Sequence, residues 1–169
     1  MNLARIVNGP PCPADVASMM WTHVKHLTPG ASCAFFLGDP VTDSVAARFV
    51  AGEASSVLQG LTMGVGERLT GWVAANQQPI VNSDAGLDLG PIAAVAGLRY
   101  CLALPMVCEA RLVGVLTLYA REQFADEQTR TLGMVTPHLA RMFLALESRS
   151  EPAAAAPLSR PALRVVASR

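Results

Sequence analysis

The chain has 169 residues, 51% hydrophobic and 15% charged, which fits one domain with a tail and supplies enough apolar material for a sizeable core. This hydrophobic content excludes a chain that is disordered throughout. Thirteen basic and thirteen acidic side chains cancel to a formal net charge of zero. That balance argues against a nucleic-acid-binding protein, because such proteins neutralise phosphates with an excess of Lys and Arg.

The first half of the chain carries alternating helix and strand signals. In order, they predict a helix over Asp15–Leu27, strands over Ala31–Leu37 and Ser44–Ala51, a helix over Arg68–Asn76 and a strand over Ile80–Ser83. Pro13 suits the start of the first helix, and Thr28-Pro29-Gly30 would end it. The turn-rich segment 38–43 is of hairpin length, so the first two strands should pair with each other.

The second half carries the strongest strand signal. Tyr100–Val107 and Arg111–Ala120 are apolar at nearly every position, as expected for strands covered on both faces. The short break between them favours an antiparallel hairpin. A final helix is predicted over 126–147, with Asp126 as its N-cap and a kink at Pro137. Antiparallel hairpins with helices at the ends and in one insertion indicate an α+β domain.

The composition also suggests where the domain begins and ends. Residues 13–147 form the predicted domain, residues 1–12 a short lead-in, and residues 148–169, rich in Ser, Arg, Pro and Ala, a flexible tail or linker. The N-terminus has no apolar stretch typical of a signal peptide, and no segment approaches the roughly 18–20 apolar residues that cross a bilayer. We therefore expect a cytoplasmic protein without a membrane partner.

Two stretches have a recognisable pattern. Residues 64–84 read GVGERLTGWVAANQQPIVNSD, a glycine-rich lead into a helix followed by a Pro-led strand and a polar turn. Cys101–Met106, Leu112–Tyr119 and Phe124–Glu127 form a core hairpin and the start of a last helix. In order and spacing these pieces resemble the GAF family of small-molecule sensor domains, over roughly residues 13–147. The resemblance implies a twisted antiparallel sheet of about six strands, terminal helices on one face, and loops and helices roofing a ligand pocket on the other.

The resemblance implies a non-catalytic sensing module that binds an unidentified small molecule and signals through helix-mediated dimerisation. It identifies no cofactor. A ligand-free dimerisation or protein-interaction module is an alternative. A third hypothesis is a reductase of free methionine sulfoxide, which needs a catalytic thiolate and a resolving partner. That branch carries its cysteines in segments that correspond to 66–71 and 84–98, where this chain has none.

Seven side chains are candidates for contact with a ligand. Trp72 could stack on a planar ligand or belong to the core, and Arg99 could meet an anionic group or stay solvated. Residues 82–84 could orient a polar ligand or simply form an Asx-type turn. On the last strand, alternation places Val113 and Val115 on the same face as the polar-tipped candidates, and we expect that face to line the pocket. The candidates are Trp72, Asn82, Ser83, Asp84, Arg99, Thr117 and Tyr119.

The last helix has the spacing of a coiled-coil seam. Apolar residues recur at intervals of 3, 4, 3 and 4, at Leu132, Val135, Leu139, Met142 and Leu146. Packing of the helix on its own sheet would produce the same pattern. We expect the terminal helices to form a homodimer, and these five residues to lie in its interface.

The cysteines and histidines predict neither a disulfide framework nor a metal site. Cys33 and Cys101 are expected to be buried, inert thiols, and Cys12 and Cys108 to be more exposed. The histidines, His23, His26 and His138, all fall on the two terminal helices, away from the expected pocket. His23 and His26 are three residues apart, but no carboxylate or cysteine at helical spacing completes a metal site.

Overall fold

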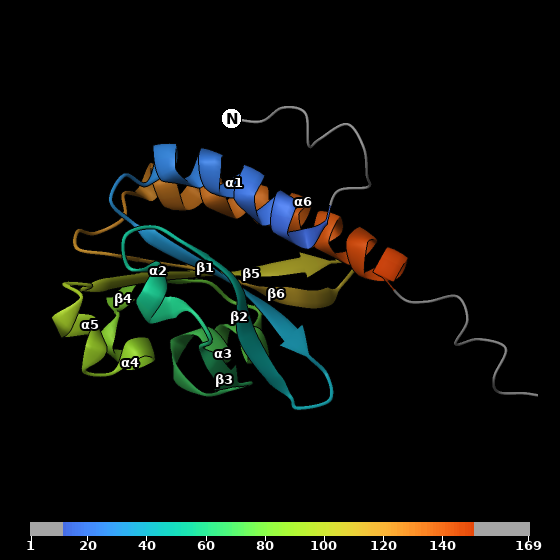
Figure 1. Ribbon diagram of the computed structural model, residues 1–169, viewed down its shortest axis with the longest axis horizontal. Coiled ribbons are helices and arrows are strands. Elements are labelled where there is room, and N and C mark those ends of the chain that lie inside the picture. The colour runs from blue at the N-terminus through green and yellow to red at the C-terminus, as the bar shows by residue number, and fades with distance from the viewer. Residues whose placement is uncertain (1–11, 151–169) are drawn as a thin grey trace, which may run out of the picture.

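The computed structural model describes residues 12–150, which form one antiparallel six-stranded sheet with helices on both faces (Figure 1). In chain order the elements are α1 (Pro13–Leu27), β1 (Ser32–Asp39), β2 (Ser44–Ala51), α2 (Ser55–Leu58), β3 (Thr62–Gly64), α3 (Arg68–Asn76), β4 (Ile80–Asp84), α4 (Gly86–Leu89), α5 (Ile92–Val95), β5 (Tyr100–Cys108), β6 (Arg111–Ala120) and α6 (Asp126–Ser150). The strand order is β3-β2-β1-β6-β5-β4, so the hairpins β1–β2 and β5–β6 meet at the centre of the sheet. The predicted α+β class is confirmed.

The long predicted elements are present, and four short ones were not located by the sequence patterns. Both hairpins and the helix α3 lie where the sequence indicates. The resemblance implied a sixth strand and helices in the insertion, but the sequence patterns gave no bounds for α2, β3, α4 and α5, each only three or four residues long. Periodicity is measured over 11–18 residues, so elements of a single turn leave no such signal.

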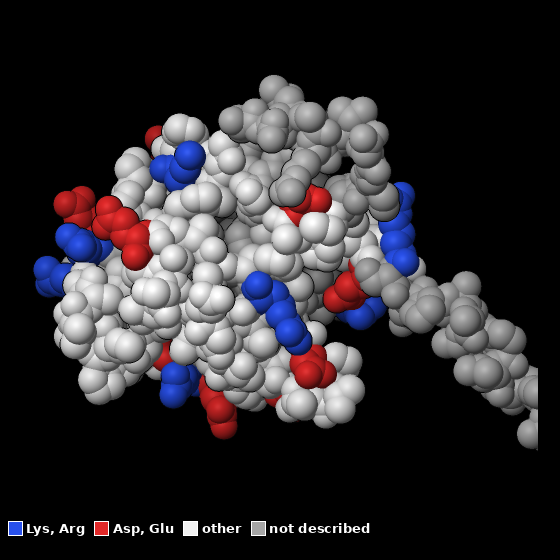
Figure 2. All heavy atoms as spheres, in the orientation of Figure 1, with Lys and Arg blue, Asp and Glu red and all other residues white. Residues whose placement is uncertain are grey.

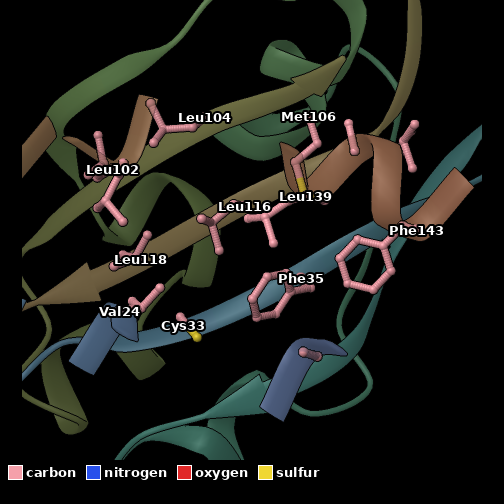
Figure 3. Close-up of a cluster of buried hydrophobic side chains, with 14 of the residues drawn as sticks. Val24, Cys33, Phe35, Leu102, Leu104, Met106, Leu116, Leu118, Leu139 and Phe143 are labelled. Atoms are coloured by element: carbon pink, nitrogen blue, oxygen red, sulfur yellow. The ribbon is translucent and has the colours of Figure 1, made fainter. Parts of the chain in front are cut away.

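Two hydrophobic layers enclose the sheet, one on each face. In Figure 1, α1 and α6 lie side by side on one face, and α2 to α5 cover the other. On the α1–α6 side, Leu139 and Phe143 point toward the sheet, and the Phe143 ring lies 5.8 Å from that of Phe35 (Figure 3). The two-sided burial predicted for β5 and β6 therefore holds.

Three of the five residues proposed for a dimer interface belong to this intramolecular core. Leu132, Leu139 and Leu146 are buried against the sheet of their own chain. They are therefore not available to a partner, and their assignment to the interface is wrong. Val135 and Met142 are partly exposed, so for them the interface role stays a prediction.

The predicted alternation along β6 fails at its beginning. The pairing of β5 with β6 shifts register between Met106 and Val107, which leaves an extra residue on β6. Beyond this bulge Val115 faces the α3 side, as expected, but Val113 packs on the α1–α6 side and Leu112 on the α3 side. Periodicity predicts the face of a strand residue only where the ladder is regular.

The start of α6 is capped differently from the prediction. Asp126 is the first helical residue rather than the N-cap, because Ala125 already provides the first helical carbonyl, to the amide of Thr129. The Gln128 side chain accepts a hydrogen bond from the Ala125 amide at 2.7 Å, which is one half of a capping box. Asp126 still places a negative charge in the first turn, where the helix dipole favours it.

Pro137 lies inside α6 and leaves the carbonyl of Gly133 without its usual helical donor. The Thr136 hydroxyl donates to that carbonyl at 3.1 Å and replaces the missing amide. The helix continues to Ser150, so residues 148–150 are helical rather than part of a flexible tail. The predicted lead-in up to residue 11 and the tail from residue 151 lie outside the described residues.

The turn of the β5–β6 hairpin offers a test of local strain. Glu109 and Ala110 both have positive φ, 51° and 61°, as in a type I′ turn that prefers Asn-Gly. We expect Ala110→Gly to raise the free energy of unfolding by about 1 kcal/mol, because glycine adopts this conformation without the Cβ clash. Urea denaturation measures the change. Ala47→Gly on β2 is the control and should be destabilising; a neutral or negative effect of Ala110→Gly would contradict the argument.

Candidate functional site

A fully buried carboxylate lies between the sheet and the helices α3 and α4. Within residues 12–150, Asp88 is the one Asp or Glu that is fully buried. Its Oδ1 accepts hydrogen bonds from the backbone amides of Leu69, at 2.8 Å, and Thr70, at 3.0 Å. Its Oδ2 accepts from the hydroxyls of Thr70, at 2.5 Å, and Tyr119, at 2.8 Å. The Cys101 thiol on β5 is a weaker fifth donor to Oδ2, at 3.9 Å. These donors replace the water that the charge loses on burial.

Asp88 caps α3 from a distant point in the sequence. The N-cap residue Glu67 makes no side-chain capping bond, and Asp88 supplies the acceptor for the N2 and N3 amides instead. The positive end of the α3 dipole also favours a carboxylate at this position. In return, the Arg68 guanidinium donates to the backbone carbonyl of Asp88 at 2.6 Å, so side chains from both helices hold α4 on the start of α3.

Close packing sets the position of α3 on the sheet. Gly71 lies so near β3 that a Cβ atom there would overlap the carbonyl oxygen of Gly64. The Gly71 carbonyl accepts a hydrogen bond from the Gly66 amide at 2.7 Å, which closes the glycine-rich segment onto the helix. This glycine therefore allows Thr70 to reach both Asp88 and the sheet.

Two predicted ligand-binding residues, Thr117 and Tyr119, belong to the same polar cluster. Both project from β6 toward α3, as expected, and both are fully buried. The Thr70 hydroxyl donates to Asp88 and lies 3.0 Å from that of Thr117, so Thr117 is the donor of that bond. Burial, and then the charge of Asp88, raises the pKa of Tyr119 well above its ordinary 10.0, which keeps the phenol protonated and able to donate. The chain's own side chains thus occupy the centre of the interface between the sheet and the helices α3 and α4.

Trp72 does not flank this interior. Its side chain is 41% exposed, while its neighbours Gly71 and Val73 are buried. It lies on the outer side of α3, so stacking on a ligand beneath the helix is excluded for this residue. A tryptophan at a helix start fits either side of the helix, and in this helix the close approach of Gly71 to β3 decides the orientation.

Three other predicted residues come together at a separate place. Asn82, Asp84 and Arg99 line a hollow of about 510 Å³ at the outer edge of the sheet, which we call the β4 groove. The groove is completed by Gly86, Gly90, Ala93, Ala94, Leu98 and Tyr100. Ser83, also predicted, is absent from this lining and pairs with Cys101 on β5.

The β4 groove combines two opposite charges that do not pair with each other. Asp84 accepts a hydrogen bond from the Gly86 amide at 2.8 Å, and the Arg99 guanidinium lies 5.6 Å from the centroid of the Tyr100 ring. Within residues 12–150 the one ion pair joins Arg111 to Glu147, well away from the groove in the sequence. Both charged side chains are exposed and can therefore contact a solute.

Asn82 is already engaged by the protein. Its amide nitrogen donates to the carbonyl of Phe124 at 2.9 Å, and its amide oxygen accepts from the Phe124 backbone amide at 2.7 Å. Its backbone has a φ of 54°, a conformation that Asn tolerates better than most residues. It forms one wall of the groove, but both ends of its amide are bound to Phe124.

The cysteines differ in exposure and chemistry. Cys33 and Cys101 are buried, as predicted, and Cys108 is buried as well at 9% exposure, contrary to the expectation. Burial raises the pKa of Cys33 from 9.0 to about 12. Burial and the neighbouring charge of Asp88 raise that of Cys101 well above 9.0. Cys101 faces α3, whereas Cys33 and Cys108 lie on the opposite face of the sheet, so neither can act as its resolving partner.

Three further features bear on other kinds of partner: the charges on one face, the possible metal ligands and the apolarity of the helices. On the face in Figure 2, acidic and basic side chains are interspersed rather than gathered by sign. No three His, Cys, Asp or Glu side chains of residues 12–150 lie close enough together to hold a metal ion. None of the helices in that part of the chain combines the length and apolarity of a membrane span.

Comparison with known proteins decides the family. The GAF domain profile matches residues 15–142, most of the chain. The chain belongs to the GAF domain family. This confirms the family resemblance, and the fold supports a sensing or ligand-binding module. A comparison with curated proteins gives no match.

Solved GAF-fold structures superpose well at low identity. The GAF domain of a phosphoenolpyruvate-protein phosphotransferase from Coxiella burnetii gives a TM-score of 0.71 at 21% identity, over 86% of this chain and 90% of that one. The GAF-B domain of DevS from Mycobacterium smegmatis gives 0.64 at 17%, over 81% and 96%. The free methionine-R-sulfoxide reductase of Neisseria meningitidis, solved with its substrate, gives 0.66 at 21%, over 86% of each chain. At these identities the likeness establishes the fold alone.

Sequence reasoning missed Asp88, which organises the site. The residue stands in Gly-Leu-Asp-Leu-Gly, positions 86–90, where an acidic residue in a glycine-bounded segment is typical of an exposed turn. The flanking leucines are the only hint of burial, and Leu87 is in fact exposed. Its partners lie 13 to 31 residues away, too far for the spacing of a helical turn or a strand to reveal them.

We expect Asp88→Ala to lower the free energy of unfolding by about 3 kcal/mol or more, because it leaves two buried amides and two buried hydroxyls without their acceptor. Asp88→Asn should lower the free energy of unfolding by less, because the amide oxygen of the asparagine can still accept hydrogen bonds from the α3 amides. Urea denaturation measures both. The exposed Glu53→Ala is the control, with an effect within about 0.5 kcal/mol. An effect of Asp88→Ala as small as that of the control would contradict the capping role.

Stability should also fall in alkali. The unfolded chain releases the protons of Cys33, Cys101 and Tyr119 near the ordinary pKa values of 9.0 and 10.0, whereas the folded protein retains them. The stabilisation is therefore complete below pH 9 and is lost as the pH rises, by at most about 1.4 kcal/mol per pH unit for each group. Urea denaturation between pH 7 and 10.5 tests this. Cys33→Ala should flatten the decline, and a constant free energy across this range would contradict it.

Proposed function

We propose that the protein is a non-catalytic, cytoplasmic sensing module that binds a small polar molecule in the β4 groove. The observation that supports this most directly is that the groove is lined by Asp84 and Arg99, which carry opposite charges and do not pair with each other. Ligand sites typically combine an apolar lining with a few convergent polar groups. Here Ala93 and Leu98 provide apolar walls between the charged residues.

Each polar residue has a role that its chemistry suits. Arg99, held near the face of Tyr100, would bind an anionic group of the ligand. Asp84 would accept hydrogen bonds from a donor group or bind a cationic one, through the carboxylate oxygen that the Gly86 amide leaves free. We place the site in the outer groove rather than beneath α3 because the polar cluster of Asp88 occupies the interior.

We further propose that the module signals as a homodimer through α1 and α6. The outward sides of these helices carry exposed apolar side chains, Met134 at 62% and Met19 at 53%. Val135 and Met142 add partly exposed apolar surface on α6. This surface supports the dimer without the three core leucines, which remain on the sheet.

A specific observation favours a second candidate, a ligand-free interaction module. The hydrogen bonds to Asp88 close the interior between the sheet and α3, as in a pocket that fills itself. In that case the dimeric helices alone carry the function. A reductase is the least supported candidate, because Cys101 is buried, its pKa is raised and no second cysteine lies on its side of the sheet within residues 12–150.

Native mass spectrometry of the protein as purified, followed by thermal-shift screening of charged and zwitterionic metabolites, tests the proposal. We expect a dimer, and at least one compound that raises the Tm of the unmodified protein. Arg99→Ala should weaken the apparent affinity for that compound at least about tenfold, which is the loss typical of a charge-assisted hydrogen bond.

Arg48→Ala removes an exposed arginine from β2, outside the groove, and serves as the matched control that leaves binding unchanged. A stabilising compound that binds Arg99→Ala as tightly as the unmodified protein would place the site elsewhere. A dimer with no responding compound would favour the interaction module.

A further inference from the structure

Asn82 makes an unusual connection between the edge of the sheet and the last helix. Its side-chain amide engages both backbone groups of Phe124, with the donor at 2.9 Å and the acceptor at 2.7 Å. One side chain thus reproduces the paired bonds of a β-ladder across 42 residues of sequence. We call this pair of bonds the Asn82 clamp. The backbone of Asn82 has a positive φ of 54°, and the two bonds to Phe124 hold the residue in this conformation.

The clamp acts on the residue that leads into α6. Phe124 is buried in the α1–α6 core layer and precedes the helix start by two residues. In the next turn Gln128 binds the amide of Ala125 at 2.7 Å and donates to the carbonyl of Leu27, the last residue of α1, at 2.8 Å. Through two adjacent connections, the position of β4 is therefore linked to both terminal helices.

The other end of the clamp is a wall of the β4 groove. Asn82 and Asp84 both line it, two residues apart on the same edge strand. The pairing of β4 with β5 is irregular between Ile80 and Ser83, so the ladder is interrupted where Asn82 lies. An edge strand with an interrupted ladder has fewer backbone bonds to resist displacement, and the clamp replaces them with bonds to Phe124.

We propose that Asn82 is the positioning residue through which occupancy of the β4 groove is reported to α6 and α1. This inference rests on the proposed function, because it concerns the same groove. A ligand held by Asp84 and Arg99 biases the position of β4, the clamp passes that bias to Phe124, and the first turn of α6 responds. A purely structural clamp would stabilise the protein without making α6 respond to the groove.

The test uses a covalent probe in place of the unidentified ligand. Ala94 is exposed and lines the groove, so Ala94→Cys, made in a Cys12→Ser background to remove the exposed native thiol, can be modified with N-benzylmaleimide. Hydrogen–deuterium exchange is then followed in peptides covering 123–135, with and without the adduct.

Two variants of Asn82 test the clamp itself. Asn82→Gly retains the positive φ and removes the amide, and Asn82→Asp keeps one acceptor and loses the donor. Asn76→Ala, which removes an amide bonded only within α3, is the matched control.

We expect the adduct to change exchange in the first turns of α6 by about fivefold or more in the Asn82 protein and in the Asn76→Ala control. The same adduct should leave that segment unchanged in Asn82→Gly and change it less in Asn82→Asp. An equal response in Asn82→Gly, or no response in the Asn82 protein, would overturn the inference. If Asn82→Gly fails to fold, Asn82→Asp decides between the same outcomes.

This experiment separates the two proposals. Because the adduct is covalent, it reports coupling between groove and helix whether or not a natural ligand binds. If α6 responds to the adduct but no metabolite binds in the screen, the proposed role of the Asn82 clamp is supported and the proposed ligand site is contradicted. If a ligand binds through Arg99 but α6 does not respond to the adduct, the proposed ligand site is supported and the proposed role of the Asn82 clamp is contradicted.

Discussion

The carboxylate of Asp88 is the constraint on which the α3 side of the sheet depends. A fully buried charge is tolerated only where donors replace water, and the donors to Asp88 come from α3, β5 and β6 rather than from its own helix. The short helix α4 has a single turn, so these bonds add to the core packing of Leu89 in holding it in place. One side chain therefore connects α4 to the start of α3 and to the central strand β6.

Much of the fold was predictable, because long amphipathic or doubly buried segments report their environment locally. The β5–β6 hairpin and α3 follow from patterns within ten residues. The candidate site was only partly predictable. Residue chemistry singled out Asp84 and Arg99, which do share a groove, but it placed Trp72 inside when it faces out. Which way a polar or aromatic residue faces depends on contacts such as Gly71 with Gly64, which no single-sequence pattern contains.

The apolar spacing of α6 also fits two different environments, and the sequence alone does not distinguish them. A helix packed on a sheet and a helix in a coiled coil both place apolar residues three and four apart. The structure assigns Leu132, Leu139 and Leu146 to the sheet, and Val135 and Met142 pack at the edge of that core with part of their surface exposed. Met134 is 62% exposed, so a partner of α6 would meet Met134 and the exposed edges of Val135 and Met142 rather than the whole predicted seam. Methionines suit such a surface, because their flexible side chains adapt to an opposing helix.

Two residues with positive φ connect segments near the β4 groove to neighbouring helices. Arg68, with φ 57°, binds the backbone of Asp88 across to α4, and Asn82, with φ 54°, binds the backbone of Phe124 across to α6. A non-glycine residue persists in this conformation when tertiary contacts compensate for the strain. Both residues are connected to the lining of the β4 groove, Arg68 through its bond to α4, whose Gly86 lines the groove, and Asn82 directly. The contact that offsets the strain of Arg68 depends on the position of α4, and the contact that offsets the strain of Asn82 depends on the position of Phe124 before α6. A displacement of either segment therefore leaves that residue's strain without compensation.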